Sequence, residues 1–372
     1  MLMSAGLPPQ EGIANYVCNL SKKLVERGHD VIIVTRGGLR AKETNYGGIR
    51  VFELPFLMAF PFHVWIHGLF VNQFLRSLEG NLDLIHIHTP LPPALSTSTP
   101  LVTTFHTPLF ADSFATDPTS LRLFLTKVLG IMSRNLEQSI ISSSQVITAV
   151  SDGVASDLQR YYGIPRKKVL VVGNAPSDEI LRAGTNSPEE RGDAAILFAG
   201  RLETRKGVLD LLESMRIVAV NIPRAKLVMI GKGPLSSTIA RKVAEYELQK
   251  QVLMKGFVTS QELLNAMMDS SMFVLPSHYE GLPTVALEAM ACRLPVVATT
   301  ARGNSDFIRS EVTGLLVPPR SPEALSRVMI RLLESDDLRA KLANNARRMI
   351  EGRFTWDRVC DRFLAAYELA MN

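Results

Sequence analysis

Two glutamates eight residues apart, Glu280 and Glu288, lie in a segment that follows an apolar run and opens a helix. Glu280 falls in the expected strand-to-helix loop and Glu288 in the second helical turn, so both carboxylates can face the carboxyl edge of a sheet. Carboxylates accept hydrogen bonds from vicinal hydroxyl groups, and the free amides of a helix start bind anions. The residues at that start are Gly281, Leu282, Pro283 as the expected first helical residue, and Thr284. Together they match a nucleotide sugar, and a capped surface helix with ordinary acidic residues is the alternative.

A second segment, 198–207, places glycines and cations at the end of another expected strand. Gly200 permits the close approach of a backbone to a ligand. Arg201 and Lys206 can neutralise the negative charge that develops on a departing diphosphate. Basic residues of a solvated loop are the plainer alternative.

Three further loops carry weaker signals. Gly231 and Gly233 stand between an apolar run and a helix like a dinucleotide fingerprint, but the third glycine and the acidic residue are missing. Hydride transfer is therefore a weak alternative. Gly12 would let the start of the first helix approach a phosphate, or would simply form a turn. His106 ends an apolar strand, a functional position in such sheets, although lone histidines are more often structural.

His86 and His88 alternate on one expected strand and therefore share a face, as two metal ligands would. The sequence offers no carboxylate or cysteine nearby as a third ligand, and it has no Asp-x-Asp pair to hold a metal on a diphosphate. We therefore expect no metal and no cofactor besides the donor substrate.

Both halves of the chain alternate short apolar runs with amphipathic helical stretches, which predicts parallel sheets with crossover helices. The expected strands are residues 2–5, 30–35, 49–53, 84–88, 101–105, 146–150 and 169–172, then 195–199, 226–230, 252–254, 272–275 and 295–299. We expect an α/β protein of two facing Rossmann-like domains, with ligands in a cleft at the carboxyl ends of the strands.

The segment 174–193 has prolines, a glycine and polar residues but no sustained apolar periodicity, so it is the expected interdomain linker. Helices of the second half are expected to begin near residues 208, 235, 260, 283 and 305. An amphipathic pattern over 356–371 predicts a final helix.

The composition excludes several classes of protein. A chain of 372 residues with 46% hydrophobic and 21% charged residues folds, and it is longer than one core usually spans. The net charge of +5 is too small to predict nucleic-acid binding. Three widely spaced cysteines show neither a metal nor a disulfide pattern, and the first residues lack the features of a secretory signal. We expect a cytoplasmic protein.

One aromatic-rich stretch, 54–75, carries no charge. It is long enough to span a bilayer, but Pro55, Pro61, Asn72 and Gln73 disfavour a span. An interfacial or acceptor-binding helix fits better, and plain core is the other alternative. A second apolar stretch, 121–132, has basic neighbours, namely Arg122, Lys127 and Arg134.

In order along the chain, these segments resemble the retaining glycosyltransferases of family 4, which have the GT-B fold. The segments that carry the resemblance are 7–13, 27–31, 83–88, 103–108, 150–152, 200–207, 231–234, 280–288 as the family's Glu-x7-Glu motif, 313–317 and 354–356. Each motif is weak alone, but the ordered set covers almost the whole chain. The resemblance implies metal-independent transfer of a hexose, with retention, from a UDP- or GDP-linked sugar to a hydroxyl acceptor.

The resemblance also implies roles for individual residues. Glu288 would hold the ribose hydroxyls, and Glu280 with the amides that follow it would hold the transferred sugar. Arg201 and Lys206 would bind the departing diphosphate. His106 would contact the sugar near the reacting carbon. The start of the first helix, at Gly12, would approach the diphosphate.

The implied domains are an acceptor-binding domain of residues 1–173, completed by the helix 356–372, and a donor-binding domain of residues 174–355. The uncharged aromatic stretch favours a membrane lipid or polyprenyl-linked glycan of cell-envelope synthesis as acceptor, with the protein peripheral on the cytoplasmic face. A soluble sugar or small metabolite is the rival acceptor. A nucleotide-sugar epimerase or phosphorylase, and a noncatalytic anion-binding or membrane-binding relative, are the other functional alternatives.

Overall fold

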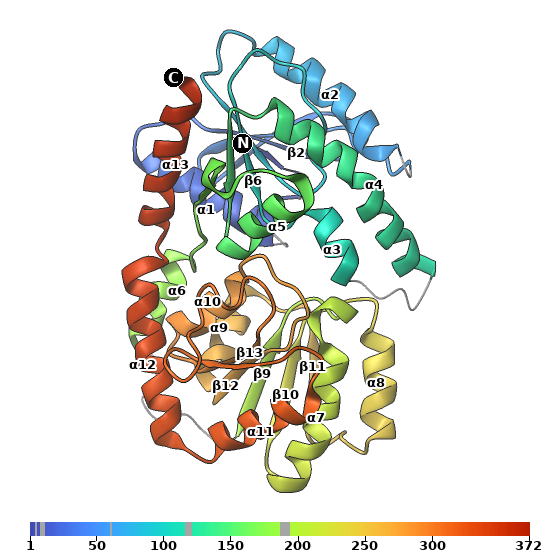
Figure 1. Ribbon diagram of the computed structural model, residues 1–372, viewed down its shortest axis with the longest axis vertical. Coiled ribbons are helices and arrows are strands. Elements are labelled where there is room, and N and C mark those ends of the chain that lie inside the picture. The colour runs from blue at the N-terminus through green and yellow to red at the C-terminus, as the bar shows by residue number, and fades with distance from the viewer. Residues whose placement is uncertain (4–5, 8–11, 60–61, 116–120, 187–193) are drawn as a thin grey trace. The chain divides into compact units, whose positions relative to one another are not determined.

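The computed structural model describes residues 1–372 except 4–5, 8–11, 60–61, 116–120 and 187–193. The chain divides into two compact units (Figure 1). Unit 1 comprises Met1–Asn174 and Trp356–Asn372, and unit 2 comprises Ala175–Thr355. Each unit has its own sheet covered by helices, so the α/β class predicted from the sequence is confirmed.

The sheet of unit 1 has eight strands in the order β3-β4-β2-β1-β5-β6-β7-β8. Their bounds are β1 (Leu2–Met3), β2 (Ile32–Arg36), β3 (Lys42–Tyr46), β4 (Ile49–Leu54), β5 (Ile85–His88), β6 (Leu101–Phe105), β7 (Val146–Ala149) and β8 (Val169–Val171). Seven of these agree with the expected strands to within two residues, apart from residues 4–5 of the first, which lie outside the described range. All pairs are parallel except β3 with β4.

Strand β3 was not predicted, because its Lys-Glu-Thr-Asn-Tyr sequence carries no apolar run. It pairs with β4 through a hairpin at Gly47 and Gly48, whose positive φ values of 59° and 88° suit a tight turn. Four of its five residues are exposed, as is usual for an edge strand that buries little surface.

The helices of unit 1 begin with α1, whose apolar stripe of Tyr16, Val17, Leu20 and Leu24 is buried. The helices are α1 (Gly12–Glu26), α2 (His63–Ser77), α3 (Leu109–Ala115), α4 (Leu121–Ser143), α5 (Asp152–Tyr162) and α13 (Trp356–Met371). The last of these lies beside α1 in Figure 1, and it buries Phe363 and Trp356 almost completely against unit 1.

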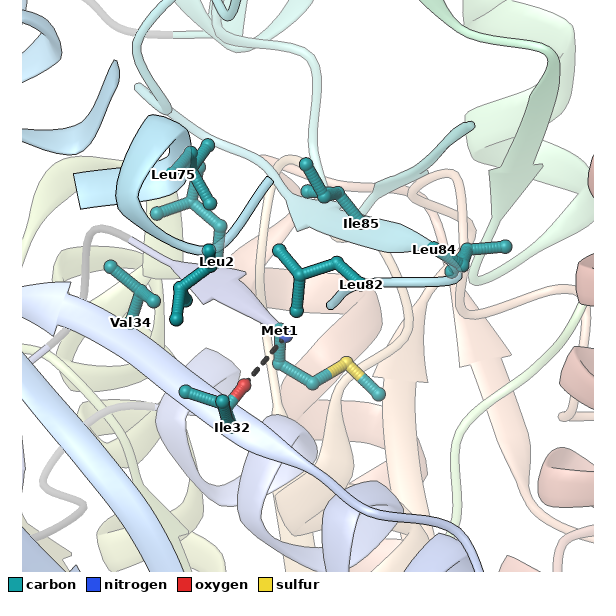
Figure 2. Close-up of a pocket in the computed structure, with 9 residues that line it drawn as sticks. Met1, Leu2, Ile32, Val34, Leu75, Leu82, Leu84 and Ile85 are labelled. Carbon is teal, nitrogen blue, oxygen red and sulfur yellow. Dashed lines mark hydrogen bonds between the residues drawn. The ribbon is translucent and has the colours of Figure 1, made fainter. Parts of the chain in front are cut away.

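A small apolar cavity lies beside the first residues of β1, β2 and β5, beneath α2 (Figure 2). The amino group of Met1 reaches this region and donates a hydrogen bond of 2.8 Å to the carbonyl of Ile32. An apolar lining of this kind offers no partners for a phosphate or a sugar.

Unit 2 contains a parallel sheet of six strands in the order β11-β10-β9-β12-β13-β14. The strands are β9 (Ala195–Ala199), β10 (Lys226–Ile230), β11 (Val252–Gly256), β12 (Met272–Leu275), β13 (Val296–Thr299) and β14 (Leu315–Val317). The helices are α6 (Asp178–Ala183), α7 (Val208–Asn221), α8 (Ser236–Glu245), α9 (Ser260–Asp269), α10 (Thr284–Ala291), α11 (Pro322–Leu333) and α12 (Asp336–Arg353). Short β14, at the edge, was not predicted.

The chain passes from unit 1 to unit 2 between Asn174 and Ala175, at the start of the linker expected over 174–193, but part of that segment is helical. Residues 178–183 form α6, whose amino end is capped by the Ser177 hydroxyl. Arg347 donates hydrogen bonds to the carbonyls of Leu181 and Ala291, so it ties α6 to the end of α10. The apolar pattern does not predict this helix because it is shorter than two turns. Residues 187–193 of the expected linker lie outside the described range.

Two expected helix starts also differ. Pro283 is the residue before α10 rather than its first residue, with ψ of 109°. No helix begins near 305: residues 302–307 form turns stabilised by Asn304, whose side-chain amide donates to the carbonyl of Thr299 at 3.1 Å. A buried side chain that bonds the local backbone replaces the helical pattern there.

Candidate active site

The strand order of unit 2 reverses between β9 and β12, which are neighbours in the sheet although β10 and β11 separate them in sequence. Ligands of open α/β sheets bind at such switch points, beyond the carboxyl ends of the strands. The loop 200–207 follows β9, and the loop 276–283 follows β12. The two segments that the sequence singled out therefore emerge side by side.

An ion pair joins the two loops. Lys206 Nζ lies 2.6 Å from Glu280 Oε1, and the two side chains are only 14% and 5% exposed. The Ser277 hydroxyl donates to the same carboxylate oxygen at 2.6 Å. The sequence patterns around Lys206 and Glu280 point to each residue separately and do not predict that the two form a pair.

Burial alone would raise the pKa of Glu280. The nearby charges of Lys206 and Arg205 and the hydrogen bonds from Lys206 and Ser277 outweigh burial, so the pKa of this carboxyl is lowered from its usual value of 4.5. Glu280 is therefore a buried carboxylate anion at neutral pH. It can accept further hydrogen bonds from a hydroxylated ligand.

The backbone between the loops is too close for side chains. Gly207 has a φ of 64°, and a Cβ there would lie 2.0 Å from the carbonyl oxygen of Pro276. The amide of His278 donates to the carbonyl of Arg205 at 2.8 Å. A second link comes from the His278 ring, whose Nε2 lies 2.6 Å from Asp210 Oδ2 in the first turn of α7. These contacts keep Lys206 and Glu280 close together. No local pattern indicates the His278 link, because Asp210 and His278 are 68 residues apart.

Glu288 lies in the second turn of α10, as predicted, and its side chain is partly exposed. Burial of the carboxyl group raises its pKa to about 7. Among the described residues no hydrogen-bond partner of this carboxyl is found. Glu288 is thus a desolvated acceptor that is open to a ligand, the condition under which a carboxylate gains most from two ligand hydroxyls.

Gly231 and Gly233 are required by the packing of the neighbouring loop. A Cβ at Gly231, where φ is 130°, would lie 1.9 Å from the carbonyl oxygen of Gly200, and one at Gly233 would lie 2.3 Å from that of Leu202. The amide of Leu202 donates to the carbonyl of Lys232 at 3.1 Å. The glycines therefore let two loops meet, a packing reason for the spacing that resembles a dinucleotide fingerprint.

Arg201 stands apart from the ion pair. Its side chain is 67% exposed, and its guanidinium lies 3.5 Å from Glu203, to which Arg205 also pairs at 3.4 Å. The helix start 281–284 is buried except for Thr284, and Gly303 packs on it: a Cβ at Gly303, with φ of 87°, would lie 2.3 Å from the carbonyl oxygen of Gly281. Arg201 is thus exposed, whereas the backbone at the start of α10 is closely packed.

In unit 1 the strand order reverses between β1 and β5. His106 follows β6, the neighbour of β5, and Gly12 is the exposed first residue of α1. Burial lowers the pKa of His106 to about 3, so its imidazole is neutral at any physiological pH. His106 can therefore act as a hydrogen-bonding group and not as a cation. The expected loop residues 8–11 lie outside the described range.

The possible metal pair has other partners. His86 Nδ1 lies 2.8 Å from the Tyr367 hydroxyl and its Nε2 lies 2.6 Å from the Thr104 hydroxyl. Both ring nitrogens of His86 are therefore occupied. Within the part of the chain that the structure describes, no group of three or more histidine, cysteine or acidic side chains is placed to hold a metal.

Comparisons with known proteins match both halves of the chain. Residues 11–177 match the family model described as Glycosyltransferase Family 4, and residues 179–349 match the one described as Glycosyl transferases group 1. A D-inositol 3-phosphate glycosyltransferase of Xylanimonas cellulosilytica is 29% identical, over 96% of this chain and 92% of its own. Among solved structures, sucrose-phosphate synthase from Thermosynechococcus elongatus superposes with a TM-score of 0.79 at 21% identity, covering 99% of this chain and 97% of its own. Anabaena HepE in complex with UDP-glucose gives 0.70 at 16% identity, covering 98% and 97%.

The raised pKa of Glu288 predicts a pH-dependent loss of stability. Because the folded protein holds this proton more tightly than the unfolded chain, stability falls as pH rises from about 4.5 through about 7. Glu288→Gln removes the effect, so this variant should be more stable than wild type at pH 8, by up to roughly 3 kcal/mol, and equal to it below pH 4.5.

Thermal unfolding across this pH range measures the difference. Exposed Glu323, in the same unit, provides the control Glu323→Gln for the loss of one charge. Parallel curves for Glu288→Gln and wild type would contradict the assignment of Glu288 as a desolvated carboxyl.

Proposed function

Because this chain belongs to the group 1 glycosyltransferases and has the GT-B fold, we propose that it moves a hexose from a UDP- or GDP-linked sugar to a hydroxyl acceptor, with retention. The observation that carries the proposal is the buried Lys206–Glu280 pair at the switch point of unit 2. A cation for a diphosphate and a carboxylate for sugar hydroxyls stand there in direct contact. The UDP-glucose complex of the structurally similar HepE supports a nucleotide-sugar donor.

Lys206 can bind Glu280 and the diphosphate at the same time. An ammonium has three donors, and the hydrogen bond to Glu280 uses one, which leaves two for the oxygens of the departing diphosphate. Arg201, which is exposed, would bind the same phosphates. Backbone N–H groups at the start of α10, where Pro283 has none to offer, would add neutral donors. In this proposal protein cations take the place of a metal ion at the leaving group.

The carboxylates of Glu280 and Glu288 would accept hydrogen bonds from hydroxyl groups of the donor. Glu280, ionised and buried, would accept from hydroxyls of the transferred sugar, and Glu288 would accept from the two ribose hydroxyls. Donation from two hydroxyls favours the charged form of Glu288, so nucleotide binding should release its proton near neutral pH. From unit 1, the start of α1 at Gly12 would approach the diphosphate, and neutral His106 would donate to or accept from the sugar.

The test is transfer itself. Purified protein is incubated with UDP- and GDP-linked hexoses and a panel of soluble polyols and polyprenyl-linked acceptors, and sugar on an acceptor is the expected product. Lys206→Met should lower kcat by on the order of 10² or more, because the charge on the leaving group loses its fixed cation. Lys226→Met, at an exposed lysine of the same unit, is the matched control and should keep wild-type turnover.

Isomerised sugar or sugar phosphate as the product would point to an epimerase or a phosphorylase instead. Unchanged turnover in Lys206→Met would refute the assigned site.

For the acceptor we propose an amphiphile at a membrane surface. Helix α2 presents an exposed apolar stripe at helical spacing, with Phe62 just before it and Trp65 and Leu69 within it, exposed by 64%, 68% and 54%. Such a stripe supports insertion into the headgroup region of a bilayer. Of the described helices, none is both long and apolar enough to cross a membrane. Arg76, a basic residue in the last turn of α2, would favour binding to anionic lipid.

Vesicle binding tests this acceptor proposal. Wild type should sediment with phosphatidylglycerol vesicles, and the double variant Phe62→Ser with Trp65→Ser should bind at least about tenfold more weakly, because each ring removes apolar area from water on insertion. Val220→Ser, at a similarly exposed apolar residue of unit 2, is the control. Wild type that ignores anionic vesicles would overturn the membrane proposal and leave the transferase proposal standing.

A further inference from the structure

A row of three histidines runs through the carboxyl edge of the unit 1 sheet. His86 and His88 share one face of β5, with ring centroids 4.0 Å apart, and the rings of His88 and His106 are 5.4 Å apart. The side chains of His86 and His88 are buried. Burial lowers the pKa of all three, so the row is neutral at physiological pH. Of the three, only His106 has a role in the proposed transfer.

His88 is hydrogen-bonded directly to His106. Nδ1 of His88 lies 3.2 Å from Nε2 of His106. Each neutral imidazole carries one proton on one of its two nitrogens, so in this bond one ring donates and the other accepts. The protonation pattern of His88 therefore decides which nitrogen of His106 bears the proton.

The other nitrogen of His88 indicates the direction of the bond. His88 Nε2 is buried and has no hydrogen-bond partner among the described residues. If Nε2 carried the proton, a buried N–H would lack an acceptor, and such orphaned donors are rarer in proteins than unsatisfied acceptors. If Nδ1 carries it, that proton is used in the bond to His106 and only a lone pair is left without a partner.

We propose that His88 is a positioning residue that fixes the tautomer of His106: His88 Nδ1–H donates to His106 Nε2, so that His106 presents Nδ1–H as a donor. This inference rests on the proposed function, in which His106 faces the transferred sugar. A neutral N–H at that place donates to a sugar oxygen without introducing a second charge. The opposite tautomer would offer the sugar a lone pair, which can only accept a hydrogen bond from a hydroxyl group.

The surroundings of His88 hold the two rings in this geometry. The ring of Tyr16 packs edge-on against His106, with centroids 4.7 Å apart, and its hydroxyl donates to the carbonyl of Gly173 at 2.9 Å. On the same strand as His88, the ring of His86 is held by hydrogen bonds to the hydroxyls of Tyr367 and Thr104. The position of His88 thus depends on α1, β6 and α13 together.

Nitrogen-15 NMR of the full chain, labelled at histidine and without substrate, tests the tautomer directly. A protonated ring nitrogen and one with a lone pair have well separated shifts, and comparison with His106→Gln assigns the His106 signals. The wild type should show His106 protonated at Nδ1. Protonation at Nε2 would overturn the proposal, whether or not the protein transfers sugar.

Two substitutions separate positioning from packing. His88→Asn places an amide donor where Nδ1–H stood, and should retain the His106 tautomer and kcat within about threefold. His88→Leu fills similar space without a donor, and should mix the tautomers and lower kcat by about 10- to 100-fold with little change in the donor KM. His29→Leu, at an exposed histidine of the same unit, controls for labelling and loss of one imidazole.

If His88→Asn lost activity as fully as His88→Leu while the His106 shifts stayed those of wild type, His88 would act through packing alone, and the proposal would fail. Should His88→Leu not fold, the wild-type and His88→Asn spectra still decide. Failure of every variant and of wild type to transfer sugar would instead count against the proposed function, since the spectra do not depend on turnover.

Discussion

The buried ion pair of Lys206 and Glu280 is the interaction on which the geometry of unit 2's site depends. A carboxylate that is 5% exposed is costly to keep charged unless a cation and hydrogen bonds replace the lost water. That requirement explains why two loops, separated by three strands in sequence, are held together by backbone contact at Gly207 and by the Asp210–His278 link. Removing either member leaves the other as an uncompensated buried charge.

Unit 1 meets the same difficulty of buried polar groups in a different way. His86, His88 and His106 stay neutral and bond to one another and to hydroxyls, so the candidate site residues of unit 2 include a charged pair and those of unit 1 are neutral hydrogen-bonding groups. This division suits a reaction in which negative charge develops on a phosphate while the sugar must be oriented. A positive charge is needed at the leaving group, and hydrogen bonds of defined direction are needed to orient the sugar.

Local patterns predicted most of the fold, because buried parallel strands are apolar runs and their loops fall at one sheet edge. They failed where burial is small, as in polar strand β3, or where an element is short, as in α6. Glu280 and Glu288 could be selected because their spacing is local. The pairing of Lys206 with Glu280, 74 residues away, and of His88 with His106 depends on strand order, which no local pattern contains.

A double-mutant cycle of Lys206→Met and Glu280→Gln, measured in free energy of unfolding at pH 7, tests whether the two loops form one electrostatic unit. Each single change should destabilise unit 2, and the two together should cost much less than their sum, with a coupling of about 2 kcal/mol or more, because the double variant leaves no unpaired buried charge. Effects that add to within about 0.5 kcal/mol would show that Lys206 and Glu280 are not coupled.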